Sequence, residues 1–216
     1  MKHFWLAHFL LSFFLLETIS GASQQEPPIV DIKTQALFSK VETLDNFLHT
    51  VTPGDTLSRL AQKYGTTIEL LRECNKISGN QIYAGMKLKV IRAHFSISIG
   101  KNHNLLVLLA DGKPIKRYRV ATGTGGSTPV GTFKIINKLE NPTWFHAGAV
   151  VPSDSPDNIL GSRWLGFDLP GYGIHGTTLP KTIGTQASKG CIRMLNSDVE
   201  EIYAAVPVGT PVSIKD

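Results

Sequence analysis

The chain has 216 residues, enough for one large domain or two smaller ones, and its 42% hydrophobic and 18% charged content excludes a disordered protein. Lys and Arg number 22 against 17 Asp and Glu, giving a formal net charge of +5, and no run of basic residues forms a patch. This argues against nucleic acid as the main partner, whereas so small an excess suits an anionic polymer or a cell-envelope surface.

The N-terminus is typical of an export signal. Lys2 precedes an apolar run over residues 4–16, and Ser20 and Ala22 follow in an A-x-A-like cleavage pattern. The run is too short to cross a bilayer of roughly 30 Å comfortably, which favours a cleaved signal peptide over an uncleaved anchor. We therefore expect residues 1–22 to be removed and the protein to be exported.

The two cysteines are Cys74 and Cys191, and an oxidising compartment permits one disulfide between them. The surroundings of Cys74 argue against this bridge, because it ends an amphipathic helical pattern as a small buried hydrophobic residue does. We therefore expect Cys191 to be a free thiol.

Residues 23–48 begin with the polar stretch SQQEPPIVD and are interpreted as a linker. Leu37, Val41, Leu44 and Leu48 follow helical spacing. The pattern predicts a short helix at the end of the linker.

Residues 49–92 are predicted to fold as strand, helix, helix, strand. After a PG turn, Asp55 or Thr56 caps the first helix and Gly65 ends it. A T-x-x-E capping box that begins at Thr66 starts the second helix. The buried helix faces are predicted to be Leu57, Leu60, Ala61, Tyr64, Ile68, Leu71 and Cys74.

The string VTPGDTLSRLAQKYGTTIELLRECN, followed by IYAGMKLKV, resembles the lysin motif (LysM), a small βααβ module. The PGDTL turn, both helix patterns and the Gly-x-x-L end carry the resemblance. That family binds glycans that contain N-acetylglucosamine, such as peptidoglycan, so the resemblance implies a shallow glycan groove; a folded spacer is the alternative. The glycan contacts that it implies are Gly54, Asp55, Thr56, Asn80 and Ile82.

Residues 93–216 change to a β pattern. Strands are predicted in FSISIG, in NLLVLLADGKPIKRYRV with its DG hairpin turn, in VGTFKIINKL, in GSRWLGF, in GYGIHGT and in GTPVSIKD. The one expected helix, SDVEEIYAAVP, takes Ser197 as its cap. Trp164 is interpreted as a core residue. We therefore expect a mainly β, β-sandwich-like domain with a helix at its margin.

His175 and Cys191 form the candidate for chemistry. A protonated thiol is a poor nucleophile, and an adjacent imidazole can take its proton. Gly176 allows close backbone approach, and Gly190 lets a tight turn present the sulfur together with backbone N–H groups that suit an oxyanion hole. Ser188 can hydrogen-bond within this turn. Structural His–Cys pairs are common, so spacing alone does not favour catalysis, and one Cys with one His falls short of a metal site.

The string GIHGTTLPKTIGTQASKGCIRMLNSDVEEIY resembles the catalytic signature of the YkuD-like L,D-transpeptidases, and TPVGTF matches a second stretch of that family. The resemblance covers residues 94–216, and a preceding LysM module is a known arrangement. It implies Cys191 as the nucleophile, His175 as the general base and Ser188 as the small hydroxyl residue of the motif. It also implies oxyanion donors on the backbone around Gly190.

Three further residues are expected at the site. Arg193 matches an arginine in one branch of the family, where it either binds a substrate carboxylate or pins the loop. Many members carry histidine at the position of Lys189, so proton transfer here rests on His175. The Lys189 cation either favours the Cys191 thiolate or points into solvent. Tyr172 is expected to flank the site.

The resemblance implies a reaction on peptidoglycan. Cys191 attacks the carbonyl of an L-centre residue in a tetrapeptide stem, D-Ala leaves, and an amine of a second stem resolves the thioester to give a 3→3 cross-link. No cofactor or metal is implied. Three alternatives stay open: an L,D-carboxypeptidase, a protein-anchoring transpeptidase, and a non-catalytic peptidoglycan-binding envelope protein. The place of action is expected to be the periplasm or cell wall of a bacterial envelope.

Overall fold

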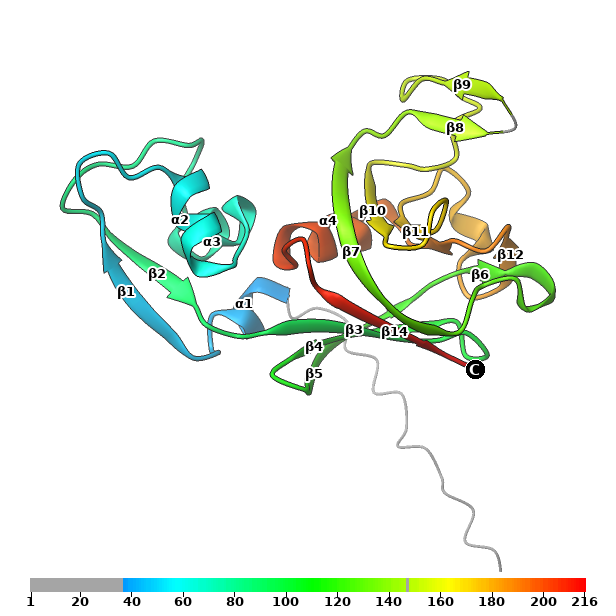
Figure 1. Cartoon of the computed structure of the whole chain (residues 1–216), viewed down its shortest axis with the longest axis horizontal. Coiled ribbons are helices and arrows are strands. Elements are labelled where there is room, and N and C mark those ends of the chain that lie inside the picture. The colour runs from blue at the N-terminus through cyan, green and yellow to red at the C-terminus, as the bar shows by residue number, and fades with distance from the viewer. Residues whose placement is uncertain (1–36, 147) are drawn as a thin grey trace, which may run out of the picture. The chain divides into compact units, whose positions relative to one another are not determined.

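A computed structural model describes residues 37–146 and 148–216 (Figure 1). The expected signal peptide and most of the expected linker lie outside these residues. Among the helices described, none is both long enough and apolar enough to cross a membrane.

A βααβ module follows a short leading helix. Its two antiparallel strands pair in one small sheet, and two helices pack against it. These elements are α1 (Leu37–Val41), β1 (Asn46–Thr50), α2 (Leu57–Tyr64), α3 (Ile68–Asn75) and β2 (Lys87–Ile91). The predicted order of strand, helix, helix and strand is confirmed.

The leading helix is shorter than its spacing predicted. Leu37 and Val41 are fully buried on α1, but Leu48 lies in β1 and is 62% exposed. The helical prediction was wrong beyond Val41 because pairing of β1 with β2 takes over, with Leu48 opposite Lys89. Local spacing carries no information about a partner strand so far along the chain.

Cap chemistry sets the ends of α2 and α3. The Oγ1 of Thr56 accepts a hydrogen bond from Arg59 N at 3.2 Å, as predicted for the first helix. The second helix starts one residue later than its predicted capping box. There Thr67 is the cap, its Oγ1 accepting from Leu70 N at 2.8 Å, so the assignment to Thr66 was wrong.

The larger part of the chain is built on one curled eight-stranded sheet (Figure 1). Its strand order is β13-β11-β10-β7-β14-β3-β4-β5. The bounds are β3 (Phe95–Gly100), β4 (Leu105–Ala110), β5 (Lys113–Arg119), β7 (Gly131–Glu140), β10 (Arg163–Phe167), β11 (Gly173–His175), β13 (Ile192–Arg193) and β14 (Pro211–Lys215). The mainly β prediction is confirmed.

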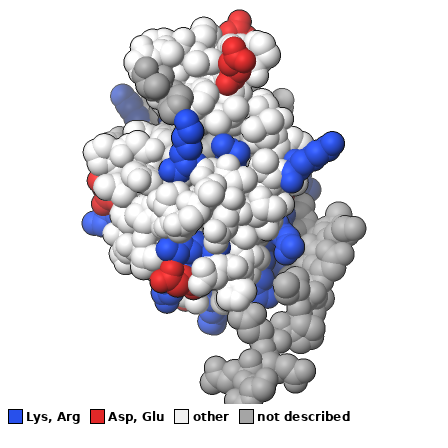
Figure 2. Space-filling view, turned by 90° about the vertical axis from the view of Figure 1, so that its right-hand side faces the viewer, with Lys and Arg blue, Asp and Glu red and all other residues white. Residues whose placement is uncertain are grey.

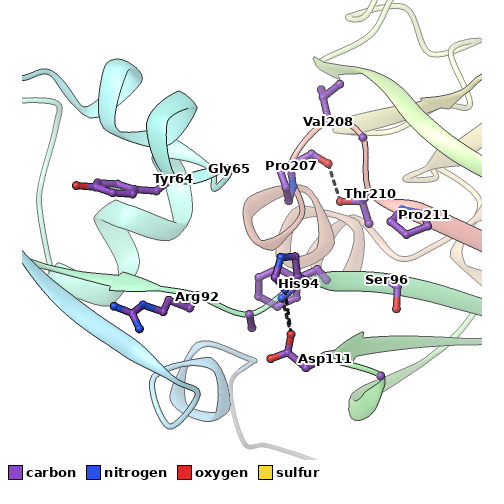
Figure 3. Close-up of a pocket in the computed structure, with 14 residues that line it drawn as sticks. Tyr64, Gly65, Arg92, His94, Ser96, Asp111, Pro207, Val208, Thr210 and Pro211 are labelled. Atoms are coloured by element: carbon purple, nitrogen blue, oxygen red, sulfur yellow. Dashed lines mark hydrogen bonds and ion pairs between the residues drawn. The ribbon is translucent and has the colours of Figure 1, made fainter.

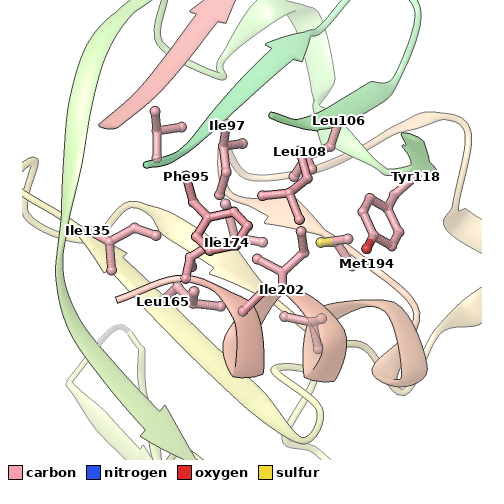
Figure 4. Packing of buried hydrophobic residues seen from close by; sticks show 14 of the residues in the cluster. Phe95, Ile97, Leu106, Leu108, Tyr118, Ile135, Leu165, Ile174, Met194 and Ile202 are labelled. Atoms are coloured by element: carbon pink, nitrogen blue, oxygen red, sulfur yellow. The ribbon is translucent and has the colours of Figure 1, made fainter. Parts of the chain in front are cut away.

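Short elements complete this domain. Two small sheets pair β6 (Thr122–Gly123) with β12 (Gln186–Ser188), and β8 (Trp144–His146) with β9 (Ala149–Val151). The helical segments are η1 (Thr124–Gly126), η2 (Pro180–Thr182) and α4 (Asn196–Ala205). Helix α4 packs on the sheet, and Figure 4 shows Ile202 among Ile97, Leu108 and Ile174 in the core.

The start of α4 differs from the prediction, and its first residue, Asn196, links two other segments of the chain. Leu195 occupies the cap position without a side-chain hydrogen bond, so Ser197 is not the cap. Instead, Oδ1 of Asn196 accepts hydrogen bonds from Ser162 N at 3.2 Å and Thr177 N at 3.0 Å. One amide thereby fixes the chain before β10 and the chain after β11.

Candidate active site

Strand register places His175 in a row of side chains across the sheet. On β11 it lies opposite Trp164 of the antiparallel neighbour β10 and opposite Arg193 of the parallel neighbour β13. Trp164 in turn lies opposite Leu139 of β7. Residues far apart in sequence therefore meet in one line that ends near Cys191.

Two hollows meet at Cys191. One of about 330 Å³ holds most of the site residues expected from the sequence: Tyr172, His175, Ser188, Lys189, Cys191 and Arg193. The other, of about 290 Å³, is more apolar and is lined by Leu139, Pro142, Trp144, Phe145, Leu160, Trp164 and again Cys191. The two hollows also share Trp144, Phe145, Leu160 and Gly171, so they adjoin beside the thiol.

The thiol of Cys191 is protonated in its resting arrangement. It is half-buried and donates a hydrogen bond to Gly171 O at 3.4 Å. Burial raises the pKa of this thiol, while a backbone hydrogen bond at Gly173 and the charge of Arg193 oppose the rise. Lys189 lines the same hollow with an exposed side chain.

His175 is held neutral and in one tautomer. The residue is 3% exposed, and its Nδ1 lies 2.6 Å from Gly176 O, a group that only accepts. Nδ1 therefore carries the proton and Nε2 keeps the lone pair that a base needs. Burial, helped by the charge of Arg193 and opposed by backbone hydrogen bonds at Gly176 and Leu160, lowers the pKa of His175 to about 4.

Two side-chain hydroxyl groups hold the turn that presents Cys191 through hydrogen bonds to backbone. Ser188 Oγ donates to Cys191 O at 2.6 Å and accepts from Gly190 N at 3.0 Å, so the Gly190 N–H is occupied within the turn. Thr128 Oγ1 donates to Gly190 O at 2.9 Å and accepts from Gly123 N at 2.7 Å. Sequence reasoning gave Thr128 no role, although the TPVGTF motif contains it.

Two expected site residues, Gly190 and Gly176, lie where a side chain would not fit. Gly190 has a φ of +132°, and a Cβ there would lie 2.7 Å from the Tyr172 ring. A Cβ on Gly176 would overlap Asn196 Oδ1. Neither glycine lines the hollow that holds His175 and Cys191, so both serve the site through close backbone packing.

The cysteines do not pair. Both are free, and Cys74 is 8% exposed within the hydrophobic cluster around the sheet. Burial raises the pKa of the Cys74 thiol to about 11, which makes it unreactive. The expectation of a free Cys191 is confirmed.

In the βααβ module, Asp55 holds the turn that precedes α2. Its Oδ2 accepts from Thr52 N at 2.8 Å, from Thr52 Oγ1 at 2.9 Å and from His49 Nε2 at 3.0 Å. Tyr64 OH lies 2.9 Å from the other ring nitrogen of His49. The hydrogen bond from Thr52 N, followed by that from His49, lowers the pKa of Asp55 to about 2.

Other predicted glycan contacts also take part in the module itself. Gly54 O accepts from Arg59 at 2.9 Å, and Thr56 caps α2. Ile82 packs against the module core, whereas Asn80 is exposed. The polar groups of Gly54 and Thr56 are therefore partly engaged before any ligand arrives.

A larger hollow of about 520 Å³ contains neither cysteine. Among the residues that line it are Tyr64, Arg92, His94, Asp111 and Thr210, and His94 Nδ1 lies 3.3 Å from Asp111 (Figure 3). On the face in Figure 2, Lys and Arg stand mostly singly between uncharged residues. This agrees with the absence of a basic run in the sequence.

Comparison with known families decides the assignment. A family model described as the L,D-transpeptidase catalytic domain, YkuD, matches residues 94–214, which is more than half of the chain. The chain belongs to the YkuD family of L,D-transpeptidases. A LysM domain model matches residues 49–90 of this L,D-transpeptidase, which therefore joins a transpeptidase domain to a peptidoglycan-binding module.

Relatives of this L,D-transpeptidase agree. It is 35% identical over 175 residues to YkuD of Bacillus licheniformis, covering 77% of this chain and 98% of that protein. It is 42% identical over 126 residues to YqjB of Bacillus subtilis, covering 56% of this chain and 70% of that protein. The crystal structure of L,D-transpeptidase 3 from Mycobacterium tuberculosis shares the fold, with a TM-score of 0.50 and 17% identity over 61% of this chain and 66% of that chain.

Proposed function

We propose that the enzyme forms 3→3 cross-links in peptidoglycan by acyl transfer through Cys191. The observation that carries the proposal is the shared hollow: the Cys191 thiol and a neutral His175 with a lone pair on Nε2 line the same space. A thiol next to a base, in a half-buried hollow, is the arrangement that covalent acyl transfer needs.

In the first half-reaction, Cys191 Sγ attacks the carbonyl carbon of the L-centre residue in a tetrapeptide stem. The thiol proton passes to His175 Nε2 as the C–S bond forms. The C–N bond to D-Ala then breaks, and the leaving amine takes the proton from His175. A thioester on Cys191 and free D-Ala result.

In the second half-reaction, an amine of another stem attacks the thioester carbon. His175 accepts the amine proton and returns it to the sulfur as the C–S bond breaks. The two hollows that meet at Cys191 give donor and acceptor separate approaches. Because Ser188 occupies the Gly190 N–H, we assign an oxyanion contact to the backbone N–H of Cys191 instead.

The LysM module serves this reaction by keeping the enzyme on the polymer. Binding of glycan strands raises the effective concentration of stems near the catalytic domain. This function requires export, so we place the enzyme in the periplasm or cell wall of a bacterial envelope. The signal-like residues 1–22 support that placement.

Incubation with purified disaccharide-tetrapeptides, followed by mass analysis, tests the proposal. The expected product is a cross-linked dimer with release of one D-Ala, absent with Cys191→Ala and retained with the matched Cys74→Ala variant. Tripeptide without dimer would identify a carboxypeptidase. Absence of any product, with binding to sacculi intact, would favour a non-catalytic or protein-anchoring role.

A further inference from the structure

Trp164 and His175 are stacked neighbours on adjacent strands. They form a register pair of β10 and β11, with ring centroids 5.9 Å apart and an interplanar angle of 20°. Directly opposite residues of antiparallel strands present their side chains on the same face. The indole therefore covers one face of the buried imidazole.

The indole is itself anchored. Trp164 Nε1 donates to Asn137 Oδ1 on β7 at 3.1 Å. Two glycines leave room for this pair: a Cβ on Gly166 would overlap Asn137 Oδ1, and one on Gly173 would lie 2.8 Å from Trp164 Cζ2. Three strands thus contribute to holding one aromatic ring against His175.

We propose that Trp164, anchored by Asn137, is a positioning residue that fixes the plane of the His175 imidazole for proton transfer with Cys191. The Nδ1 contact with Gly176 O fixes one edge of the ring but leaves rotation about that contact. Stacking removes this freedom, so Nε2 keeps one direction through both half-reactions. The inference rests on the proposed role of His175 as the base.

The stack also sets the solvation of His175. The charged and titratable groups that line its hollow are Arg193 on β13, Lys189 and Cys191 on the turn before β13, and Tyr172 before β11. The indole carries no charge, so its removal changes the access of water to the ring and leaves these charges in place. Loss of the stack should therefore raise the pKa of His175 from about 4 toward its ordinary value.

Steady-state kinetics of Trp164→Leu test the proposal with disaccharide-tetrapeptide as substrate. We expect kcat to fall by at least about tenfold with KM within about twofold, since general-base catalysis contributes roughly 10²–10⁴-fold. Trp164→Phe keeps a ring without the tether, and Asn137→Ala keeps the indole without its anchor, so both should fall between wild type and Trp164→Leu. These two milder variants keep the test open if Trp164→Leu does not fold.

Phe167→Leu is the matched control. Phe167 lies on the same strand and stacks on Phe133, with centroids 5.6 Å apart, away from the His175 row. We expect it to keep kcat within about twofold. The acid limb of the kcat profile should lie at higher pH in Trp164→Leu than in Phe167→Leu.

Two outcomes would overturn the proposal: equal kcat and equal acid limbs in Trp164→Leu and Phe167→Leu, or a rise confined to KM, which would make Trp164 a substrate contact. A separate arm isolates the underlying function. His175→Gln must lose turnover; if it does not, the proposed role of His175 fails whatever Trp164 does.

Discussion

Ser188 Oγ and Cys191 O are joined by a 2.6 Å hydrogen bond across the turn that carries the proposed nucleophile. The same hydroxyl accepts from Gly190 N, and Thr128 holds Gly190 O from the neighbouring loop. The position of the sulfur is therefore set by two hydroxyl groups that bond to backbone. We expect them to act on the proposed reaction by fixing this geometry.

A carbapenem should label one cysteine only. Its ring carbonyl is an acyl donor, and Cys191 lines both hollows whereas Cys74 is buried with a pKa raised to about 11. Intact-mass spectrometry should show one adduct on wild type and on Cys74→Ala, and none on Cys191→Ala. An adduct mapped to Cys74 would refute the assignment of the nucleophile.

Thr128→Val should weaken both stability and acylation. The valine removes a hydroxyl that bonds Gly190 O and Gly123 N in a buried place, which typically costs about 1–3 kcal/mol. Thr128→Ser should restore most of the loss. Thr124→Val is the control, since the Thr124 hydroxyl bonds Gln186 O at an exposed position. Equal carbapenem acylation rates in the two valine variants would contradict a role of the Thr128 hydroxyl in positioning Cys191.

Arg193 should matter more than Lys189 for thiol reactivity. The charge of Arg193 lowers the pKa of the Cys191 thiol, so Arg193→Met should raise that pKa and slow alkylation by iodoacetamide about tenfold for each unit of rise. Lys189→Met should change the rate less. Alkylation rates measured across pH, with Cys74→Ala as background, compare the two. The opposite ranking would assign the tuning charge to Lys189.

Acid should destabilise the catalytic domain through His175. Its pKa is about 4 in the folded protein, against about 6.5 when unfolded. In the window between these values the unfolded chain binds a proton that the folded chain does not, so the free energy of unfolding falls as the pH is lowered. The full effect corresponds to about 3 kcal/mol.

Urea unfolding followed by fluorescence of Trp144 and Trp164, both in the catalytic domain, measures this dependence. His175→Gln should show a smaller loss of stability between about pH 7 and pH 4.5 than wild type, because the glutamine does not titrate. An unchanged dependence in that variant would mean that other groups cause the acid sensitivity.

Asp55→Ala should weaken binding to sacculi without direct action on a sugar. The carboxylate holds the turn through Thr52 and His49, so its loss releases the loop that the sequence assigns to glycan contact. Turnover of soluble disaccharide-tetrapeptides should stay at the wild-type level. Asp45→Asn, a charge change at a mostly exposed residue, is the control for co-sedimentation assays. Normal co-sedimentation of Asp55→Ala would contradict this role.

The sequence predicted those parts of the fold that local chemistry decides. Gly65 ends α2 in the left-handed region, and the Asp111–Gly112 turn has positive φ at both residues, as its DG pair indicates. Local chemistry failed where distant partners decide. Leu48 joined a strand because β2 pairs with it, and Asn196 took over the start of α4 because two loops converge on its amide.

The same division applies to the site. Resemblance to the L,D-transpeptidase signature was enough to select His175 and Cys191 together, although their spacing alone was not. It was not enough for Trp164, which was interpreted as core although it lines a hollow and stacks on His175. Its role depends on the register between β10 and β11, and a register is a property of paired strands that neither strand encodes alone.

The protonated state of Cys191 has a consequence for the lifetime of the enzyme. Thiolates, far more than thiols, react with peroxides and other oxidants, and the proposed export would bring the enzyme into an oxidising medium. Because burial raises the pKa of Cys191, it favours the less reactive thiol between turnovers. Because the other cysteine, Cys74, is buried, we expect the enzyme to lose activity slowly and to need no reductant for storage.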